Sequence, residues 1–152
     1  MAFPYGQDFK ETTGLATYRT SKTAEFTVGA GTGSVGTFAL FTVTGQVIVR
    51  VVAVCTDTLV EGVGGGTIEI GITADTATII AQTVSTAVAV NEIWHDATPD
   101  ADIELLSVMG DFIIVNGMDI FATIAGQNIT DGTVVFYCFW TPLSADGAVV
   151  AA

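Results

Sequence analysis

The densest cluster of side chains capable of chemistry lies between His95 and Glu104. It holds the only histidine of the chain and acidic residues at every second position, Asp100, Asp102 and Glu104. Two carboxyl groups at a fixed separation can act as acid and as base or nucleophile in glycoside hydrolysis. Side chains at i and i+2 share a face only in an extended segment, and Pro99 favours a loop. We therefore interpret the segment as a solvated turn and expect no catalytic residues and no enzymatic activity.

Metal binding by the same segment is a weaker alternative. Several carboxylate oxygens in one loop suit calcium, but the EF-hand spacing with its glycine and terminal glutamate is absent. Zinc usually takes nitrogen and sulfur ligands, and this chain has one histidine and no Cys-x-x-Cys pair. His95 has no serine or cysteine nucleophile at a recognisable spacing, so we interpret it as a packed histidine beside Trp94. We predict no metal and no cofactor.

A second motif, Gly31-Thr-Gly-Ser-Val-Gly36, has the glycine spacing of dinucleotide-binding loops. Such a loop binds pyrophosphate only where the N-terminus of a helix follows it. The next residues, 37–44 (TFALFTVT), are typical of a strand, so we predict a loop of a hairpin. Cys55 and Cys138 both lie in apolar runs, which favours buried free thiols; their spacing leaves a disulfide open.

Composition indicates a β protein and excludes several functions. Sixteen acidic against four basic residues give a net charge of −12, which excludes a nucleic-acid-binding protein with a basic face. Charged residues make up 13%, against about 25% in typical soluble domains, while 23 threonines and many valines and isoleucines favour strands. The most apolar stretch, residues 46–60, is interrupted by Arg50 and Asp57, so we expect no membrane span. We also expect no secretory signal, because the N-terminus lacks a basic and then apolar region.

Strand patterns separated by turn residues recur from Ala24 onward and predict an all-β fold, a jelly-roll-like or Greek-key β-sandwich. The run at 46–55 is apolar at nearly every position, so we expect a central strand covered on both faces. Asn116-Gly117 predicts a hairpin turn, and 103–109 could be a short helix or a strand. The predicted strands are residues 25–30, 37–44, 46–55, 67–73, 78–84, 92–96, 112–116, 119–125 and 133–142.

The first 23 residues differ from the rest, and we predict an extended N-terminal arm (1–23) followed by a β-sandwich domain (24–152). The arm holds three basic and two acidic residues, net +1, whereas the domain holds Arg50 alone against 14 acids, net −13. The arm is rich in aromatic residues, so we expect it to dock on a neighbouring subunit; a frayed terminus is the alternative. The candidate interface residues are Phe3, Tyr5, Phe9, Lys10, Tyr18, Arg19 and Lys22.

Several segments of the second half together resemble the head cement, or decoration, proteins of tailed double-stranded DNA bacteriophages. The resemblance is best over residues 45–147 and is carried by the segments EIWHDATP (92–99), IIVNG (113–117), Asp119-Ile120, ITDGT (129–133), FYC (136–138) and WTPLSADG (140–147). It implies a jelly-roll-like sandwich on the outside of the expanded head, with the major capsid protein and other copies of the chain as partners. His95 and the acidic residues 100–104 depart from this pattern.

Composition agrees with such a role on separate grounds. A chain with few charges and many apolar residues suits a surface that is covered by neighbours, and its acidic net charge suits the outside of a shell that holds DNA. We therefore predict a virion structural protein that clamps major capsid proteins as a homodimer or homotrimer and contacts neither nucleic acid nor membrane. The alternatives are a carbohydrate-binding jelly roll of a fibre or tail, with Trp94, Trp140 or tyrosines stacked on sugars, and a small hydrolase using carboxylates of residues 96–104.

Overall fold

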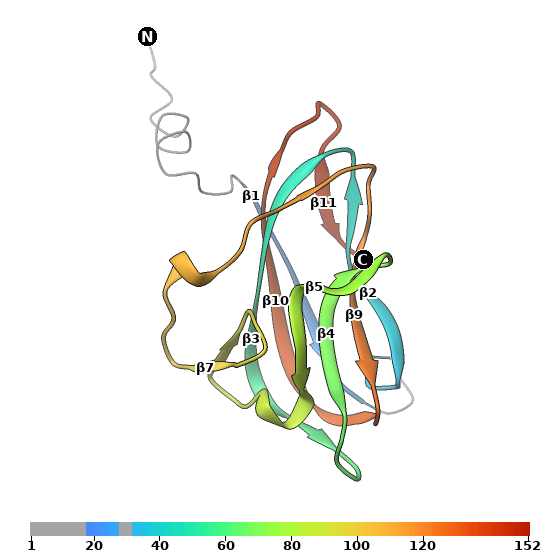
Figure 1. The fold of residues 1–152 in the computed structure, drawn as a ribbon, viewed down its shortest axis with the longest axis vertical. Helices are drawn as coiled ribbons and strands as arrows, with labels where there is room; N and C mark the ends of the chain where they lie inside the picture. The colour runs from blue at the N-terminus through green and yellow to red at the C-terminus, as the bar shows by residue number, and fades with distance from the viewer. Residues whose placement is uncertain (1–17, 28–31) are drawn as a thin grey trace.

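The computed structural model describes residues 18–27 and 32–152, which form two antiparallel β-sheets packed face to face (Figure 1). Sheet A has the strand order β1-β10-β3-β6-β7, and β8 also pairs with β3. Its strands are β1 (Tyr18–Glu25), β3 (Val47–Glu61), β6 (Glu92–Trp94), β7 (Asp100–Ala101), β8 (Phe112–Ile114) and β10 (Ile129–Pro142). Sheet B has the order β11-β2-β9-β4-β5. Its strands are β2 (Gly36–Thr44), β4 (Thr67–Ile72), β5 (Asp75–Val84), β9 (Ile120–Ala125) and β11 (Ala148–Ala151).

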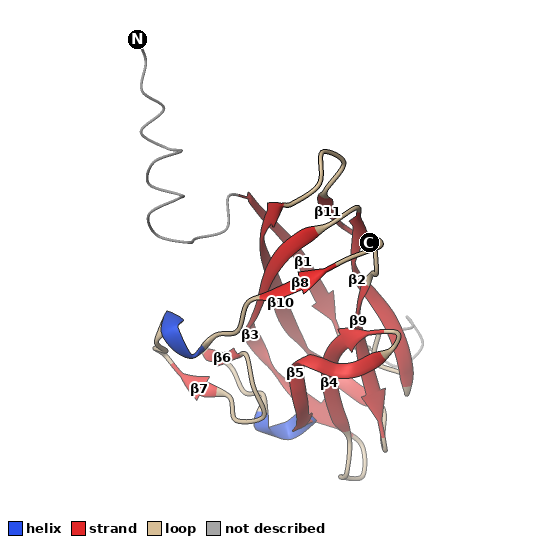
Figure 2. Cartoon of the chain, turned by 45° about the horizontal axis from the view of Figure 1, so that its top comes forward, coloured by secondary structure: helices blue, strands red, loops and turns tan. Residues whose placement is uncertain are grey.

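The strand order is that of a jelly roll. β1, β10, β3 and β6 lie side by side in sheet A, and β2, β9, β4 and β5 lie side by side in sheet B, so the chain crosses repeatedly from one sheet to the other (Figure 2). β11 adds a strand beside β2 at the edge of sheet B. The predicted all-β sandwich is therefore confirmed.

The core lies between the two sheets, and in strands such as β9 it is built from alternate positions. In β9, Ile120, Ala122 and Ile124 are buried, while the residues between them are half-buried. β3 is central in sheet A, as predicted, and its outward-facing Val52 is buried as well. The near-continuous apolar run in this strand thus reflects cover on both faces for at least part of its length.

Sheet A begins earlier than the sequence predicts. Residues 18–23, assigned there to the arm, belong to β1, which pairs with β10 along its whole length. The strand predicted over 25–30 is wrong at Phe26 and Thr27, which follow β1 and lie outside any strand. β1 is an edge strand, and seven of its eight residues are exposed or half-buried. Without an apolar alternation it has no period-2 signal.

Asn116 and Gly117 form a turn, but the predicted hairpin is wrong. Both residues have φ 60°, in the left-handed region that a tight turn requires. β8 before the turn pairs with β3 in sheet A, whereas β9 after it pairs in sheet B. The Gly117 N–H donates to the Gly45 carbonyl at 3.1 Å, and the Asp119 carboxylate accepts the Val43 N–H at 2.8 Å. These bonds hold the chain where it crosses between sheets.

The described residues contain two short helices, both of the 3-10 type: η1 (Ser85–Ala87) and η2 (Leu106–Val108). The second resolves the ambiguity over residues 103–109, where the sequence allowed a short helix or a strand. Within residues 18–27 and 32–152, no helix has the length and apolar character needed to cross a membrane.

Cys55 on β3 and Cys138 on β10 are free and buried, in agreement with the favoured interpretation. The two strands pair with Cys55 opposite Val134 and Cys138 opposite Val51, four residues further along. At about 3.4 Å per residue this offset is roughly 14 Å, well beyond the roughly 7 Å that a disulfide allows between Cα atoms. Burial raises the pKa of Cys55 to about 11 and that of Cys138 to about 12.

Candidate functional site

The residues predicted as an interface fall into two groups. Four of them lie outside the described residues and stay a prediction: Phe3, Tyr5, Phe9 and Lys10. The other three lie on β1, at one edge of sheet A: Tyr18, Arg19 and Lys22. The Arg19 guanidinium lies over the ring of Tyr137, 5.7 Å from its centroid. The structure thus places the second group on the sandwich itself.

Side chains of β1 join this strand to its neighbours. Tyr18 stacks on Trp140 with ring centroids 4.5 Å apart, and the Trp140 indole N–H donates to the Thr20 hydroxyl at 3.1 Å. Lys22 Nζ donates to the carbonyl of Ala152, which follows the last strand of sheet B. These contacts close the edge at which β1 and β11 meet, so Tyr18 and Lys22 have a structural role within the chain.

Large apolar side chains are exposed at the opposite side of sheet A, on the loop after β7. We call Ile103, Leu105, Leu106 and Val108 the apolar loop. All four are more than half exposed, Ile103 by 82%. Figure 2 shows the loop and η2 beside β6 and β7, outside the two layers of the sandwich. Apolar side chains gathered in this way on a protein surface commonly mark a contact with another macromolecule.

The apolar loop is attached at one end by a backbone hydrogen bond and at the other by a buried side chain. The Asp102 N–H donates to the Asn91 carbonyl at 3.0 Å, and Asp102 has φ 66°, which turns the chain away from β7. At the other end the Met109 N–H donates to the Leu106 carbonyl at 3.2 Å, and the Met109 side chain is buried. The exposed side chains therefore lie on a segment whose two ends are attached to the sandwich.

His95, Asp100 and Glu104, which we call the His95 cluster, lie between β6 and the apolar loop. β6 and β7 pair antiparallel with Ile93 opposite Asp100, which brings Asp100 back beside His95. His95 Nε2 is 3.5 Å from Asp100 Oδ2 and 3.9 Å from Glu104 Oε2. The His95 side chain is only 3% exposed, as its interpretation as a packed histidine requires. The segment that the sequence analysis interprets as a solvated turn therefore includes a compact polar cluster around His95.

The two carboxyl groups of the cluster have opposite electrostatic environments. A hydrogen bond with Glu104 raises the pKa of Asp100, because the protonated Asp100 can donate to the Glu104 carboxylate. The pKa of Glu104 is lowered, first by the Leu105 N–H that it accepts and then by Asp100. A proton taken up by this pair is therefore held mainly by Asp100.

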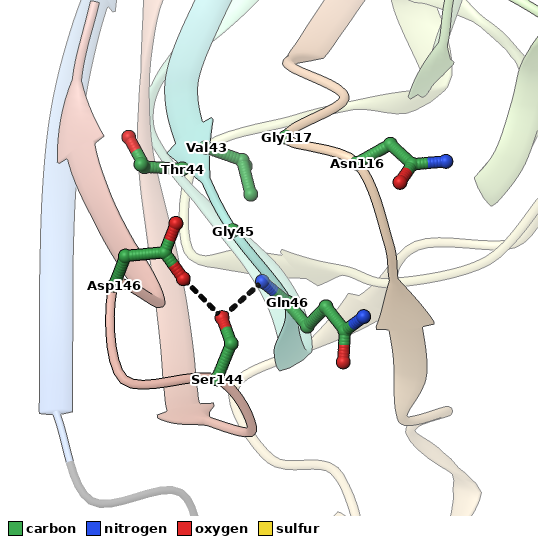
Figure 3. Close-up of a pocket in the computed structure, with 8 residues that line it drawn as sticks. All are labelled: Val43, Thr44, Gly45, Gln46, Asn116, Gly117, Ser144 and Asp146. Carbon is green, nitrogen blue, oxygen red and sulfur yellow. Dashed lines mark hydrogen bonds between the residues drawn. The ribbon is translucent and has the colours of Figure 1, made fainter.

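A polar hollow of about 480 Å³ lies elsewhere, where three turns meet at one end of the sandwich (Figure 3). The Ser144 hydroxyl accepts the Gln46 N–H at 2.8 Å and donates to Asp146 Oδ1 at 2.6 Å. The Asn116 side chain points away from this pair. The hydroxyl and carboxylate of the hollow thus serve to join the turns, and the arrangement presents no acid–base pair to a substrate.

Neither tryptophan offers a free ring face of the kind that sugar stacking uses. Trp94 is fully buried, and its indole N–H donates to the Thr83 hydroxyl at 2.8 Å. Trp140 is half-buried, with Tyr18 stacked on its ring. The carbohydrate-binding alternative therefore loses its two tryptophan platforms.

Sequence reasoning missed the apolar loop and the contact between His95 and Glu104. The residues 103–108 (IELLSV) have the composition of a core segment, and only their placement outside the sheets shows that they are exposed. The acidic spacing was noticed, but its link to His95 depends on the pairing of β6 with the two-residue strand β7. The one sequence signal for the pairing of β6 with β7 is Thr98-Pro99, which favours a reversal of the chain direction between the two strands.

The fold and surface define a class: a jelly-roll sandwich with an exposed apolar loop. Neither a protein-family model nor a curated protein matches the sequence. Among solved structures, the fold is similar to a chain in the acidic stable capsid structure of Helicobacter pylori bacteriophage KHP30. The TM-score is 0.53, the alignment covers 90% of this chain and 95% of that one, and 13% of the residues are identical. The two chains therefore share a fold over nearly their whole lengths and are of similar size.

Proposed function

We propose that this chain is a structural protein of a bacteriophage virion. The observation that carries the proposal is the fold shared along almost the entire chain with a component of a phage capsid structure. The alignment covers 95% of the other chain, so that chain has no large additional domain that this chain lacks. The resemblance of residues 45–147 to head cement proteins, which rests on short sequence motifs, supports the same class independently.

Within that class, we infer a cement or decoration protein on the outer surface of the head. A net charge of −12 favours the outside of a shell that contains DNA, where like charges do not meet. The apolar loop supplies the contact surface, and the major capsid protein is the partner whose neighbouring copies are clamped. Repetition around the lattice would strengthen modest contacts, because a copy attached at two points dissociates only when both are released.

Self-association is the second part of the proposal. Most oligomers have closed symmetry, and a dimer or trimer on a local symmetry axis would reach two or three capsid subunits at once. The N-terminal arm, with Phe3, Tyr5, Phe9 and Lys10, is proposed to reach a neighbour. β1, which follows the arm, begins at Tyr18 on the edge of sheet A opposite to the apolar loop. Arm and loop would then contact different neighbours.

The direct test is the copy number of this chain in purified particles, measured by gel densitometry against the major capsid protein. A cement protein gives a ratio near one or another fixed lattice ratio. A few copies per particle would instead indicate a tail or fibre component, and absence from particles would refute a virion role. Analytical ultracentrifugation of the purified chain tests the oligomer: a monomer that also fails to bind assembled heads would contradict the proposal.

A further inference from the structure

His95 has a buried nitrogen that the rest of the described chain leaves without a hydrogen bond. The side chain is 3% exposed, and Nε2 has no hydrogen-bond partner. The Asp100 and Glu104 carboxylates lie at 3.5 and 3.9 Å from it, at and beyond the distance limit of a hydrogen bond. A buried polar nitrogen without a partner costs about 1–3 kcal/mol, so such an arrangement calls for an explanation.

The distances fit atoms that share a metal ion. One ligand atom from each of His95, Asp100 and Glu104 lies within 4.8 Å of the others. Around a tetrahedral ion with bonds of about 2.1 Å, neighbouring ligand atoms are about 3.4 Å apart. The His95–Asp100 separation already has this value, and the Glu104 carboxylate would need to move by only about half an ångström toward Nε2.

Apart from His95, which is positive only when it is protonated, no positive side chain lies in the cluster to balance its two carboxylates. Among the described residues only Arg19, Lys22 and Arg50 carry a permanent positive charge. Arg19 and Lys22 lie on β1, at the other edge of sheet A. Arg50 is held by Asp111, with Nε–Oδ1 and Nη2–Oδ2 distances of 2.8 and 3.0 Å. A divalent cation would neutralise the carboxylates and give Nε2 its missing partner.

We propose that His95, Asp100 and Glu104 bind a divalent first-row transition metal ion, for which zinc is the probe. One imidazole nitrogen and two carboxylate oxygens form a ligand set that zinc accepts, with water completing the coordination. Calcium and magnesium prefer oxygen ligands alone. The Asp96 carboxylate lies 4.0 Å from Nδ1, beyond the distance of a direct hydrogen bond. This site was not expected from the sequence, which predicted no metal.

The test is isothermal titration of the full-length, metal-free chain with zinc chloride near pH 7.5. The proposal expects one zinc ion per chain. Asp100→Asn and Glu104→Gln should weaken binding by at least about 100-fold, since even partners outside the ligand shell affect affinity 10–100-fold. Asp102→Asn is the matched control: it removes the same charge from the same loop, its side chain is exposed, and asparagine tolerates the positive φ of 66°.

Circular dichroism of each variant establishes that it is folded, and the two ligand variants provide separate tests if one of them fails to fold. Cobalt substitution adds an independent readout, because the chain has a single histidine. A paramagnetically shifted imidazole N–H would therefore come from His95. The proposal is overturned if zinc binding is not saturable, or if the wild-type chain and the three variants bind zinc with equal affinity. It is also overturned if Asp102→Asn loses as much zinc affinity as the two ligand variants. A cobalt–thiolate charge-transfer band, or displacement of zinc by a tenfold excess of calcium, would overturn it as well.

Discussion

Replacing two side chains of the apolar loop by serine should abolish much of the affinity for capsid. Full burial of an isoleucine or leucine is worth about 1.5–3 kcal/mol. Ile103 is 82% exposed and Leu106 59% exposed in the isolated chain, so a partner that covers both can recover that fraction of the burial energy. Scaled in this way, the two side chains together are worth about 2–4 kcal/mol, on the order of a 30- to 1,000-fold change in Kd.

The assay compares the wild-type chain with the double variant Ile103→Ser and Leu106→Ser for sedimentation with heads from which the protein has been removed. Because both side chains are exposed, the free energy of unfolding should change by less than about 0.5 kcal/mol per substitution. Val63→Ser is the matched control: Val63 is 86% exposed but lies in the connection between β3 and β4. A double variant that binds as tightly as wild type, or a control that is weakened equally, would refute the assignment of this surface.

Four further predictions concern the arm and the core. Deleting residues 1–17, which stops short of β1, should leave the melting temperature unchanged and lower occupancy on heads; unchanged occupancy removes the arm from the mechanism. Because burial raises the pKa of Cys55 to about 11 and of Cys138 to about 12, both thiols should resist Ellman's reagent at pH 8 until the chain is denatured. Their contribution to stability is complete below the ordinary thiol pKa of 9.0 and is lost progressively as pH rises from there through the raised values of about 11 and 12, so the urea midpoint should fall between about pH 9 and 12; a constant midpoint contradicts this. Trp94→Phe removes the donor to Thr83 and should cost about 1–3 kcal/mol in urea unfolding, whereas a smaller loss would mean that the bond contributes little.

The strands that build the core could be predicted because their sequence carries either an apolar alternation or a continuous apolar run. Residues 67–72 alternate isoleucine with threonine, glutamate and glycine, and the structure forms β4 over that range. The apolar run at 46–55 predicted a central strand, and β3 lies between β10 and β6. In both cases the strand could be recognised from its own residues, but the burial of β4 does not follow its alternation, because Glu69 and Gly71 are buried as well as Ile68 and Ile70.

Elements at the edges could not be predicted in this way, because their structure depends on what they pair with. β1 is polar and mostly exposed, and it is a strand because β10 offers it eight partners in register. β7 has two residues and no pattern at all, yet its pairing with β6 brings Asp100 to His95. The turn at Asn116-Gly117 has the expected backbone, but which sheet each flanking strand joins is decided by the whole topology.

The proposed metal site and the proposed docking surface meet at Glu104, which lies between Ile103 and Leu105 in the apolar loop. An ion that holds Glu104 against His95 and Asp100 would restrict the loop before it docks, and ordering a loop in advance lowers the entropic cost of binding. Zinc should therefore tighten binding of the wild-type chain and of Asp102→Asn to heads, but not that of Glu104→Gln. Zinc titration of the isolated chain separates the two proposals, since it does not depend on any partner. A chain that binds zinc with one-to-one stoichiometry but docks equally well with and without it would have a metal site that stabilises the loop without contributing to assembly.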